Sequence, residues 1–303
     1  MVNNFSLLVN SFIGIFFLHC WILIDSLCDK NYQQMIYSST FIFSFILLRI
    51  LLSTQQTCRI ERTNIEQGGC KLKEIRVISY NTGMILLTGT VAEQKAALLS
   101  EYIKNYDIIL LQEFFWNPIS RGWGIDDILQ SEGFDIVIPP SIPFWGVEFL
   151  NSGLLIALRT NIFKIESVRF DRFSDSESID ILSTKGVLQC TTECGLTILN
   201  THAQADYSVD EDVFPYDGEH IETRKKQLSE LVGWIPNRYE NIVIGGDFNF
   251  GSRQEVDWFE SQIGLDTRTI NGVDAIFSNL PLVKSKTFYI DSDHLALETI
   301  LKN

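Results

Sequence analysis

The sequence of 303 residues has little charge, and what it has is mostly acidic. Only 20% of the residues are charged and 46% are hydrophobic, which excludes a disordered or fibrous chain. Residues 1–73 hold six basic and four acidic residues, whereas residues 74–303 hold 18 and 34, a net charge of −16. A domain this acidic has no general attraction to nucleic acid, so a sequence-independent DNA-binding protein is disfavoured. A nuclease is not excluded, because a bound cation could hold one phosphate.

Several chemical signatures are also missing. The six cysteines form no Cys-x-x-Cys pair and no His–Cys spacing, which argues against a zinc site. Cys190 and Cys194 flank a predicted hairpin turn and could pair, but we expect free thiols. No Ser or Cys stands in a nucleophile elbow, so direct attack by water is favoured over a covalent route. Internal repeats and low-complexity tracts are absent.

Two stretches near the N-terminus lack charge almost completely. They are residues 5–24 and residues 31–52, the second interrupted only by Arg49. Each is close to the roughly 20 residues of a membrane-crossing helix, so we expect a transmembrane helical hairpin over residues 1–52, followed by a linker over residues 53–73. A pair of buried helices packed on the domain is the alternative. A cleaved signal peptide fits poorly, because no basic residue precedes the first stretch.

The charges around this hairpin predict its orientation. Basic residues follow the second stretch, while the short link between the stretches has a net charge of −1. The positive-inside rule then predicts a multi-pass membrane protein with two helices and its catalytic domain on the cytoplasmic side.

Residues 74–303 alternate between short apolar runs and helix-like segments. The runs, typical of buried strands, are residues 75–80, 108–112, 153–158, 186–190, 196–200 and 242–246. Helical spacing appears over residues 90–105 and 219–234. In the second segment the apolar side chains share one face and the basic ones, Arg224 among them, lie elsewhere. Strands with interspersed helices indicate a mixed α/β sandwich.

Uncommon polar residues stand where the predicted strands end. Asn81, Glu113, His202 and Asp247-Phe-Asn249 each follow an apolar run, and Asp293-His294 precedes another. Strand ends that converge on one rim can assemble a site from distant parts of a sequence. The Asn, Glu and Asp oxygens suit a hard cation such as Mg²⁺, and the histidines suit proton transfer or a hydrogen bond to phosphate. Each motif alone is more often a turn, a cap or a structural histidine, but their joint occurrence indicates a site.

Together these motifs resemble those of the endonuclease/exonuclease/phosphatase superfamily. The matching residues are Ser-Tyr-Asn81, Leu-Gln-Glu113, Asn-Thr-His202, Gly-Gly-Asp247-Phe-Asn249 and Ser-Asp293-His294. The resemblance covers residues 74–303. It implies a four-layer αββα sandwich that cleaves a phosphoester with Mg²⁺ as cofactor.

The resemblance also implies a role for each residue. The metal ligands would be Asn81, Glu113 and Asp293. Asp274, in Asn-Gly-Val-Asp-Ala-Ile-Phe, would orient His294, which would act as general base or phosphate ligand.

Three further residues would act on the reacting groups. Asp247 would orient or activate the water, and Asn249 would hold a phosphoryl oxygen. His202 would donate a hydrogen bond to the phosphate or to the leaving oxygen.

The residues around the motifs are similar to those of neutral sphingomyelinases. They are Gln112-Glu113-Phe-Phe115, Asn151-Ser-Gly-Leu-Leu, Lys185-Gly186-Val-Leu, Thr201-His202-Ala-Gln204-Ala-Asp206 and the pair Arg224 and Gln227. This likeness implies phospholipase C-type hydrolysis of a membrane lipid, sphingomyelin, to ceramide and phosphocholine. An acidic domain also fits a lipid with a cationic choline head better than it fits DNA, so no nucleic-acid partner is expected.

Other functions remain open on the same scaffold. A nuclease or an inositol phosphate phosphatase would need basic residues near the rim, for which Lys185 and Arg121 are the obvious candidates. A non-catalytic membrane interaction module would be favoured by the loss of a site residue, yet all the expected ones are present.

Overall fold

The computed structural model describes most of the chain after residue 57. The described residues are 39–40, 58–64, 69, 73–83, 90–115, 125–140, 151–206, 220–235 and 241–303. The chain divides into a small unit, residues 1–55 and 143–146, and a large unit, residues 56–142 and 147–303. Of the small unit only the helical residues Ser39 and Thr40 are described.

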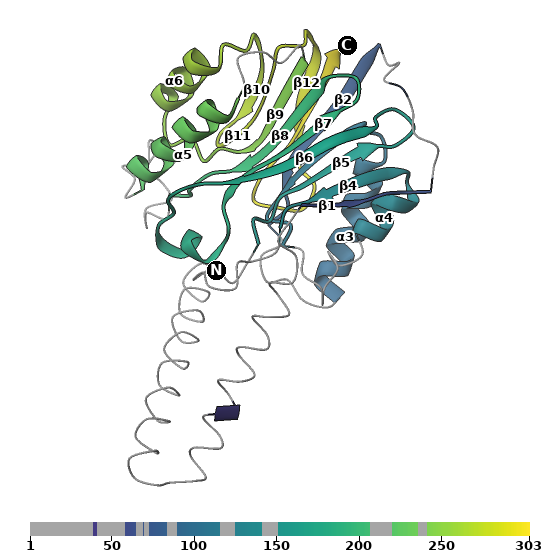
Figure 1. Cartoon of the computed structure of the whole chain (residues 1–303), viewed down its shortest axis with the longest axis horizontal. Coiled ribbons are helices and arrows are strands. Elements are labelled where there is room, and N and C mark those ends of the chain that lie inside the picture. The colour runs from purple at the N-terminus through teal and green to yellow at the C-terminus, as the bar shows by residue number, and fades with distance from the viewer. Residues whose placement is uncertain are drawn as a thin grey trace. The chain divides into compact units, whose positions relative to one another are not determined.

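The described part of the large unit contains two β-sheets (Figure 1). The first has the strand order β1-β4-β5-β3-β2-β13-β12. Its strands are β1 (Arg59–Glu61), β2 (Glu74–Asn81), β3 (Ile108–Gln112), β4 (Phe134–Ile138), β5 (Leu155–Arg159), β12 (Leu282–Phe288) and β13 (Ala296–Lys302). Only β2 and β3 pair in parallel, and all other neighbours in this sheet are antiparallel.

The second sheet has the strand order β10-β11-β9-β8-β7-β6. Its strands are β6 (Ile165–Arg172), β7 (Gly186–Thr192), β8 (Leu196–His202), β9 (Asn241–Asp247), β10 (Thr267–Asn271) and β11 (Asp274–Ser278). Here β8 and β9 form the parallel pair. Each sheet therefore has one parallel pair in its interior, with antiparallel strands on both sides.

Three buried clusters show how the layers stack. Val77, Leu110, Val243 and Ile276 belong to a cluster that fills the space between the sheets. Helices α3 (Thr90–Ile103) and α4 (Ile125–Ser131) pack on the outer face of the first sheet. Helices α5 (Ile221–Trp234) and α6 (Arg253–Ile263) pack on the outer face of the second. The order helix, sheet, sheet, helix is the expected four-layer sandwich (Figure 1).

Most expected elements coincide with observed ones. Five of the six apolar runs lie on strands, the run 153–158 overlaps β5 from residue 155, and the two segments with helical spacing contain α3 and α5. Helices α4 and α6 and the 3-10 helix Ser178–Leu182 were not predicted. The expected linker over residues 53–73 contains the edge strand β1, which pairs with β4.

The expected membrane localisation is wrong. No helix in the described part of the chain is long and apolar enough to cross a membrane. The longest described helices, α3 and α5, have 14 residues, fewer than the roughly 20 that a crossing requires. The two uncharged segments on which that prediction was based, residues 5–24 and 31–52, lie outside the described residues except for Ser39 and Thr40.

The cysteines differ from the expectation in one respect. Cys190 is buried and free, as predicted, and Cys58 is also free. Cys194 is disulfide-bonded, so the expectation of a free thiol there is wrong. Because Cys190 is free, the pairing of Cys190 with Cys194 is not formed.

Candidate active site

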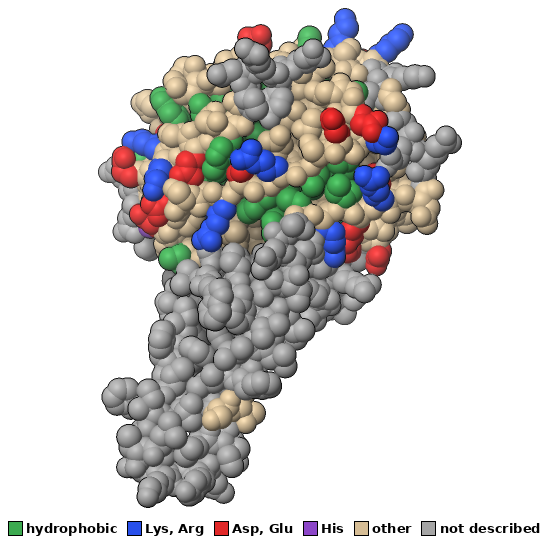
Figure 2. Space-filling view, viewed as in Figure 1, with side chains coloured by type: hydrophobic (Ala, Val, Ile, Leu, Met, Phe, Trp, Pro, Cys, Tyr) green, Lys and Arg blue, Asp and Glu red, His purple; other side chains and the backbone are tan. Residues whose placement is uncertain are grey.

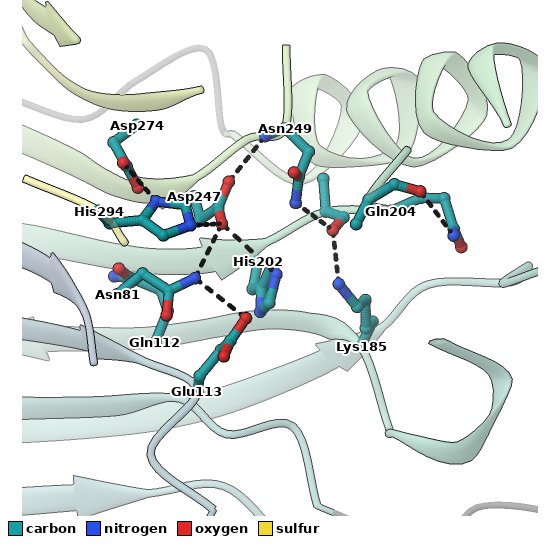
Figure 3. A network of polar contacts seen from close by, with 12 residues as sticks. Asn81, Gln112, Glu113, Lys185, His202, Gln204, Asp247, Asn249, Asp274 and His294 are labelled. Atoms are coloured by element: carbon teal, nitrogen blue, oxygen red, sulfur yellow. Dashed lines mark hydrogen bonds and ion pairs between the residues drawn. The ribbon is translucent and has the colours of Figure 1, made fainter. Parts of the chain in front are cut away.

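The two parallel strand pairs bring polar side chains to one edge of each sheet. Asn81 ends β2 opposite Gln112, which ends β3 and is followed by Glu113. In the other sheet, His202 ends β8 opposite Asp247, which ends β9. Because the carboxyl ends of parallel neighbours lie at the same edge, these groups meet where the sheets face each other (Figure 3).

The amide of Asn81 links the two sheets. Its Nδ2 donates to Glu113 Oε1 at 3.1 Å and to Asp247 Oδ2 at 2.9 Å, while its Oδ1 accepts from the backbone N–H of Gly83 at 3.0 Å. Asn81 and Asp247 are both buried. The amide thus holds two carboxylates close together away from water, an arrangement that favours a bound cation.

Two site residues have a left-handed backbone. Glu113 has φ 54° and Asn249 has φ 51°, a region that costs non-glycine residues of order 1–3 kcal/mol. Glu113 directly follows β3, and Asn249 is two residues after the end of β9. The turn at Asn249 lets its backbone N–H donate to Asp247 Oδ1 at 3.0 Å. Its side-chain Nδ2 donates to the carbonyl of Ala203 at 3.1 Å.

His294 connects Asp247 with Asp274, which begins β11. Asp274 Oδ2 lies 2.7 Å from Nδ1 of His294, whose Nε2 is 3.8 Å from Asp247 Oδ2. His202 Nε2 lies 3.6 Å from the same Asp247 oxygen. One ligand atom each from Asp247, Asp274 and His294 lies within 4.8 Å of the other two. The group is therefore a cluster of acidic and histidine ligands that can hold a metal ion.

The two histidines have opposite electrostatic environments. Burial alone would lower the pKa of His294, but its hydrogen bond to Asp274 and the charges of Asp247 and Asp274 raise that pKa to about 10. Burial lowers the pKa of His202 well below its ordinary value, and the positive charges of Lys185 and His294 lower it further. At neutral pH and without a metal, His294 is therefore an imidazolium and His202 a neutral imidazole.

Burial and neighbouring negative charge raise the pKa of two carboxyl groups of the site. Burial raises the pKa of Glu113 to about 7, against the hydrogen bond from Asn81, and the charge of Asp247 raises it too. Burial and the charge of Asp247 also raise the pKa of Asp274. Oδ1 of Asp274 is buried and has no hydrogen-bond partner among the described residues. Crowded carboxylates with an orphaned oxygen fit a hard divalent cation, which prefers oxygen ligands.

The structure brings seven of the eight expected site residues into this network. They are Asn81, Glu113, His202, Asp247, Asn249, Asp274 and His294. Asp293 is not among them. It is exposed, and its Oδ1 accepts a hydrogen bond from Ser292 Oγ at 3.0 Å. Asp293 therefore has no hydrogen bond or ion pair with the other expected site residues among the described ones, although its charge helps to raise the pKa of His294.

The motif order and the stacked sheets agree with a family match along the chain. Residues 78–294, more than two thirds of the chain, match the Endonuclease/Exonuclease/phosphatase family. The chain belongs to this family. The match begins on β2 and ends at His294, so it includes every residue of the network, and it confirms the resemblance seen in the motifs. Members of this family are hydrolytic phosphoesterases.

Solved structures with this fold include a sphingomyelinase, a beta toxin and TDP2. Sphingomyelinase C from Streptomyces griseocarneus has a TM-score of 0.56 at 15% identity, covering 76% of this chain and 99% of that one. A beta toxin from Staphylococcus aureus with bound magnesium ions has a TM-score of 0.55 at 17% identity, covering 76% and 100%. TDP2 from C. elegans has a TM-score of 0.53 at 18% identity, covering 76% and 75%. At these identities the likeness shows the fold, and no curated protein matches the chain.

Lys185 is one of the two basic residues near the motifs that could hold an additional phosphate. Lys185 is only 3% exposed, so it does not contribute to an exposed basic surface. Its Nζ donates to the carbonyl of Ala203 at 2.7 Å and lies 3.1 Å from Asp180 Oδ1. Ala203 directly follows His202, and its carbonyl also accepts from Asn249 Nδ2. Lys185 therefore anchors the loop after β8.

Beneath the site, the side-chain amides of Gln112 and Asn200 form a buried pair that the sequence did not predict. Gln112 Nε2 donates to Asn200 Oδ1 at 2.7 Å, and Asn200 Nδ2 donates to the carbonyls of Leu111 and Leu155 at 2.8 and 2.9 Å. Both side chains are fully buried between the sheets. The sequence signal for this pair is a polar residue among apolar neighbours in each strand, Gln112 in β3 and Asn200 in β8. These bonds fix how the sheets align directly below Glu113 and His202.

Proposed function

We propose that the protein is a Mg²⁺-dependent phosphodiesterase that hydrolyses sphingomyelin to ceramide and phosphocholine. The observation that carries the proposal is the network in which Asn81 joins Glu113 to Asp247 while His294 joins Asp247 to Asp274. The likeness of the flanking motifs to neutral sphingomyelinases, and the shared fold of sphingomyelinase C, support this choice of substrate.

The different protonation states of His294 and His202 suit them to different catalytic roles. The imidazolium of His294 is suited to donate a hydrogen bond to a negatively charged phosphoryl oxygen, because Asp274 holds its other nitrogen. A neutral His202 is suited to donate to the phosphate or to the leaving oxygen without adding charge. Of the two roles that the family resemblance offers for His294, the raised pKa favours the phosphate ligand over the general base.

Asp247 is the group best placed to orient the attacking water. Its Oδ1 is held by the N–H of Asn249 and its Oδ2 by Asn81, so the carboxylate has a fixed direction. Asn249 donates one amide hydrogen to Ala203, which leaves the other for a phosphoryl oxygen. In the proposed reaction the water oxygen bonds to phosphorus and gives up one proton to Asp247. The bond from phosphorus to the ceramide oxygen breaks and that oxygen takes up a proton, so that the net change transfers one proton from water to ceramide.

Glu113 and the neighbouring carboxylates would hold the metal ion. The crowding that raises the pKa of Glu113 would be relieved by a divalent cation, and oxygen donors favour Mg²⁺ among the common ones. When bound, Mg²⁺ offsets negative charge on the phosphate and on the departing alkoxide. Asp274 Oδ1, buried and without a partner among the described residues, is a further oxygen within the cluster.

The surroundings of the site favour a substrate with a single phosphodiester over one with many phosphates. The ammonium of Lys185 is buried and engaged by Asp180 and Ala203, so it is not available to hold a second phosphate. On the face seen in Figure 2, Lys and Arg side chains lie among Asp and Glu side chains and do not form a continuous basic surface. Arg121, the other basic candidate, lies outside the described residues.

The test is phosphocholine release from sphingomyelin in mixed micelles by the full chain. We expect release with Mg²⁺, none with EDTA, and none from the Glu113→Gln variant. The matched control is Glu222→Gln, whose carboxylate is 90% exposed on α5 and should leave the rate unchanged. Mg²⁺-dependent cleavage of DNA or of an inositol phosphate without any release from sphingomyelin would overturn the substrate. Release in EDTA at the full rate would overturn the metal dependence.

A further inference from the structure

We propose that Arg224 on α5 is a positioning residue that holds the two site loops together from behind. These loops are residues 203–206, which follow His202, and residues 248–252, which follow Asp247 and contain Asn249. Neither the family match nor the motifs assign Arg224 a role. The inference rests on the proposed phosphodiesterase activity for one of its readouts.

The first observation is the burial of a full charge. Arg224 is 0% exposed and is among the largest fully buried side chains of the described residues. It lies on the same face of α5 as Leu228 and Leu231, both in the core. An apolar side chain would pack on this face without the cost of removing a charge from water. Packing alone therefore does not explain why a charged guanidinium is buried at this position.

The second observation is a chain of contacts from Arg224 to the loop after β9. Nε of Arg224 donates to Glu255 Oε2 at 3.2 Å, and the same oxygen accepts from the backbone N–H of Gly251 at 2.6 Å. Gly251 is two residues after Asn249. A Cβ at Gly251 would lie 2.3 Å from Nη2 of Arg224, so only glycine lets the loop approach the guanidinium this closely. Arg224 thus fixes the far end of the turn that directs Asn249.

The third observation is that the same helix face also holds the loop after β8. Nη1 of Arg224 lies 3.9 Å from Asp206 Oδ2. One turn further along α5, Gln227 Oε1 accepts from the backbone N–H of Gln204 at 2.7 Å. Asp206 and Gln204 are four and two residues after His202. Both loops are therefore tied to one helix, at points directly behind the site.

The electrostatics make Arg224 necessary to this arrangement. Glu255 and Asp206 are carboxylates with side chains only 7% and 6% exposed, and both form ion pairs with the guanidinium. Neither oxygen of Asp206 has a hydrogen-bond partner among the described residues, so the ion pair with Arg224 is its compensation. Without the positive charge, two buried like charges would face each other and push the loops apart. Ala203, which joins the loops by accepting from Asn249, would then shift with them.

The kinetic signature of such a shift is a lower kcat with little change in KM. His202 and Asn249 would act on the phosphate as charge develops, so their displacement weakens the transition state more than substrate binding. A misplacement on the order of 1 Å can cost about 100-fold in rate. A purely structural residue would change the fraction of folded protein but not the kcat of the folded molecules.

The experiment compares Arg224→Ala with Arg253→Ala in the full chain. Arg253 is the matched control, because it is an exposed arginine on α6 paired with Asp257. We expect kcat to fall about 10- to 100-fold in Arg224→Ala, with KM within about twofold, and no change in Arg253→Ala. A pocket of about 570 Å³, lined by Arg224, Gly251 and Glu255 among others, opens beside the deleted side chain. Guanidinium ions at millimolar concentration should therefore restore kcat in Arg224→Ala, while sodium at equal ionic strength should not.

A second readout does not depend on the substrate. Hydrogen exchange of the amides of Gly251 and Gln204 should become faster in Arg224→Ala and be slowed again by guanidinium. If sphingomyelin is not hydrolysed by the parent chain, this measurement still tests the positioning role. Loss of amide protection with kcat unchanged would overturn the proposal, as would a kcat loss that guanidinium does not restore. If Arg224→Ala fails to fold, two other variants replace it: Arg224→Lys, which keeps the charge, and Arg224→Gln, which removes it. We expect a higher kcat in Arg224→Lys than in Arg224→Gln, and equal kcat values in the two would overturn the proposal.

Discussion

The raised pKa of His294 leads to a sharp prediction for Asp274→Asn. The hydrogen bond of 2.7 Å between His294 Nδ1 and Asp274 Oδ2 is the largest of the influences that raise this pKa to about 10. A hydrogen bond to a charged group contributes about 1.5–3 kcal/mol, and about 1.4 kcal/mol corresponds to one pKa unit. Replacing Asp274 by Asn should therefore lower the pKa of His294 by about one to two units.

The measurement is an NMR titration of the histidine ring signals in EDTA. The chain has four histidines, and a His294→Gln variant identifies the signal that belongs to His294. Asp293→Asn is the control, because Asp293 is adjacent in sequence but contributes the smallest of the charges that raise the pKa of His294. An unchanged pKa in Asp274→Asn, or an equal fall in Asp293→Asn, would refute the reasoning.

The same shift predicts how stability depends on pH. A histidine whose folded pKa is raised stabilises the folded protein fully below about pH 6.5, and this contribution is lost as the pH rises through about 10. The free energy of unfolding, measured with urea in EDTA, should therefore fall less steeply on the alkaline side in Asp274→Asn than in the parent.

Two further predictions concern stability. The pKa of Glu113 is raised to about 7, so its contribution to metal-free stability is present below about pH 4.5 and lost as the pH rises through 7. Glu113→Gln should therefore have a higher Tm than the parent at pH 8 in EDTA. Mg²⁺ should raise the Tm of the parent but not of the variant. A variant with an equal or lower Tm in EDTA would contradict this. Gly246 has φ 151° and a Cβ there would lie 2.1 Å from the carbonyl oxygen of Thr201, so Gly246→Ala should lower the free energy of unfolding by about 2–5 kcal/mol in urea titrations. Gly233→Ala, in open space on α5, should leave it unchanged or raise it by up to about 1 kcal/mol, and equal effects of the two substitutions would show that backbone crowding is not the cause.

The convergence of the site was predictable because strand ends are marked in the sequence. Asn81, Glu113, His202 and Asp247 each follow an apolar run, and parallel neighbours carry such residues to the same edge. The four-layer order followed from the resemblance, and the buried clusters show it. The edge strand β12 gave no such signal, because nearly all its side chains are exposed.

Side-chain direction at irregular positions was not predictable. Asp293 and His294 are neighbours in a turn, where no period of two or of 3.6 residues fixes which way a side chain points. One enters the site and the other faces solvent. The same holds for the left-handed turns at Glu113 and Asn249, which residue type alone does not indicate.

Arg224 shows how charge can mislead a sequence analysis. It was placed away from the buried face of its helix, yet residues 224, 228 and 231 follow helical spacing and all are buried. The helical spacing correctly predicted the buried face of α5. The assumption that a charged residue lies on the exposed face was wrong for Arg224. Its partners Asp206 and Glu255 come from other parts of the sequence, so no local pattern reveals them.

The position of β13 in its sheet has a consequence for synthesis on the ribosome. This strand, Ala296–Lys302, lies between β2 and β12 and pairs with residues 74–79 of β2. Until β13 emerges, the growing chain exposes an unpaired edge of the strand that ends in Asn81, and such an edge invites pairing with other chains. A nascent chain that ends before residue 296 would therefore lack the strand that joins β2 to β12 in the first sheet. Shortening the gene from its 3′ end would yield aggregates rather than a smaller working enzyme.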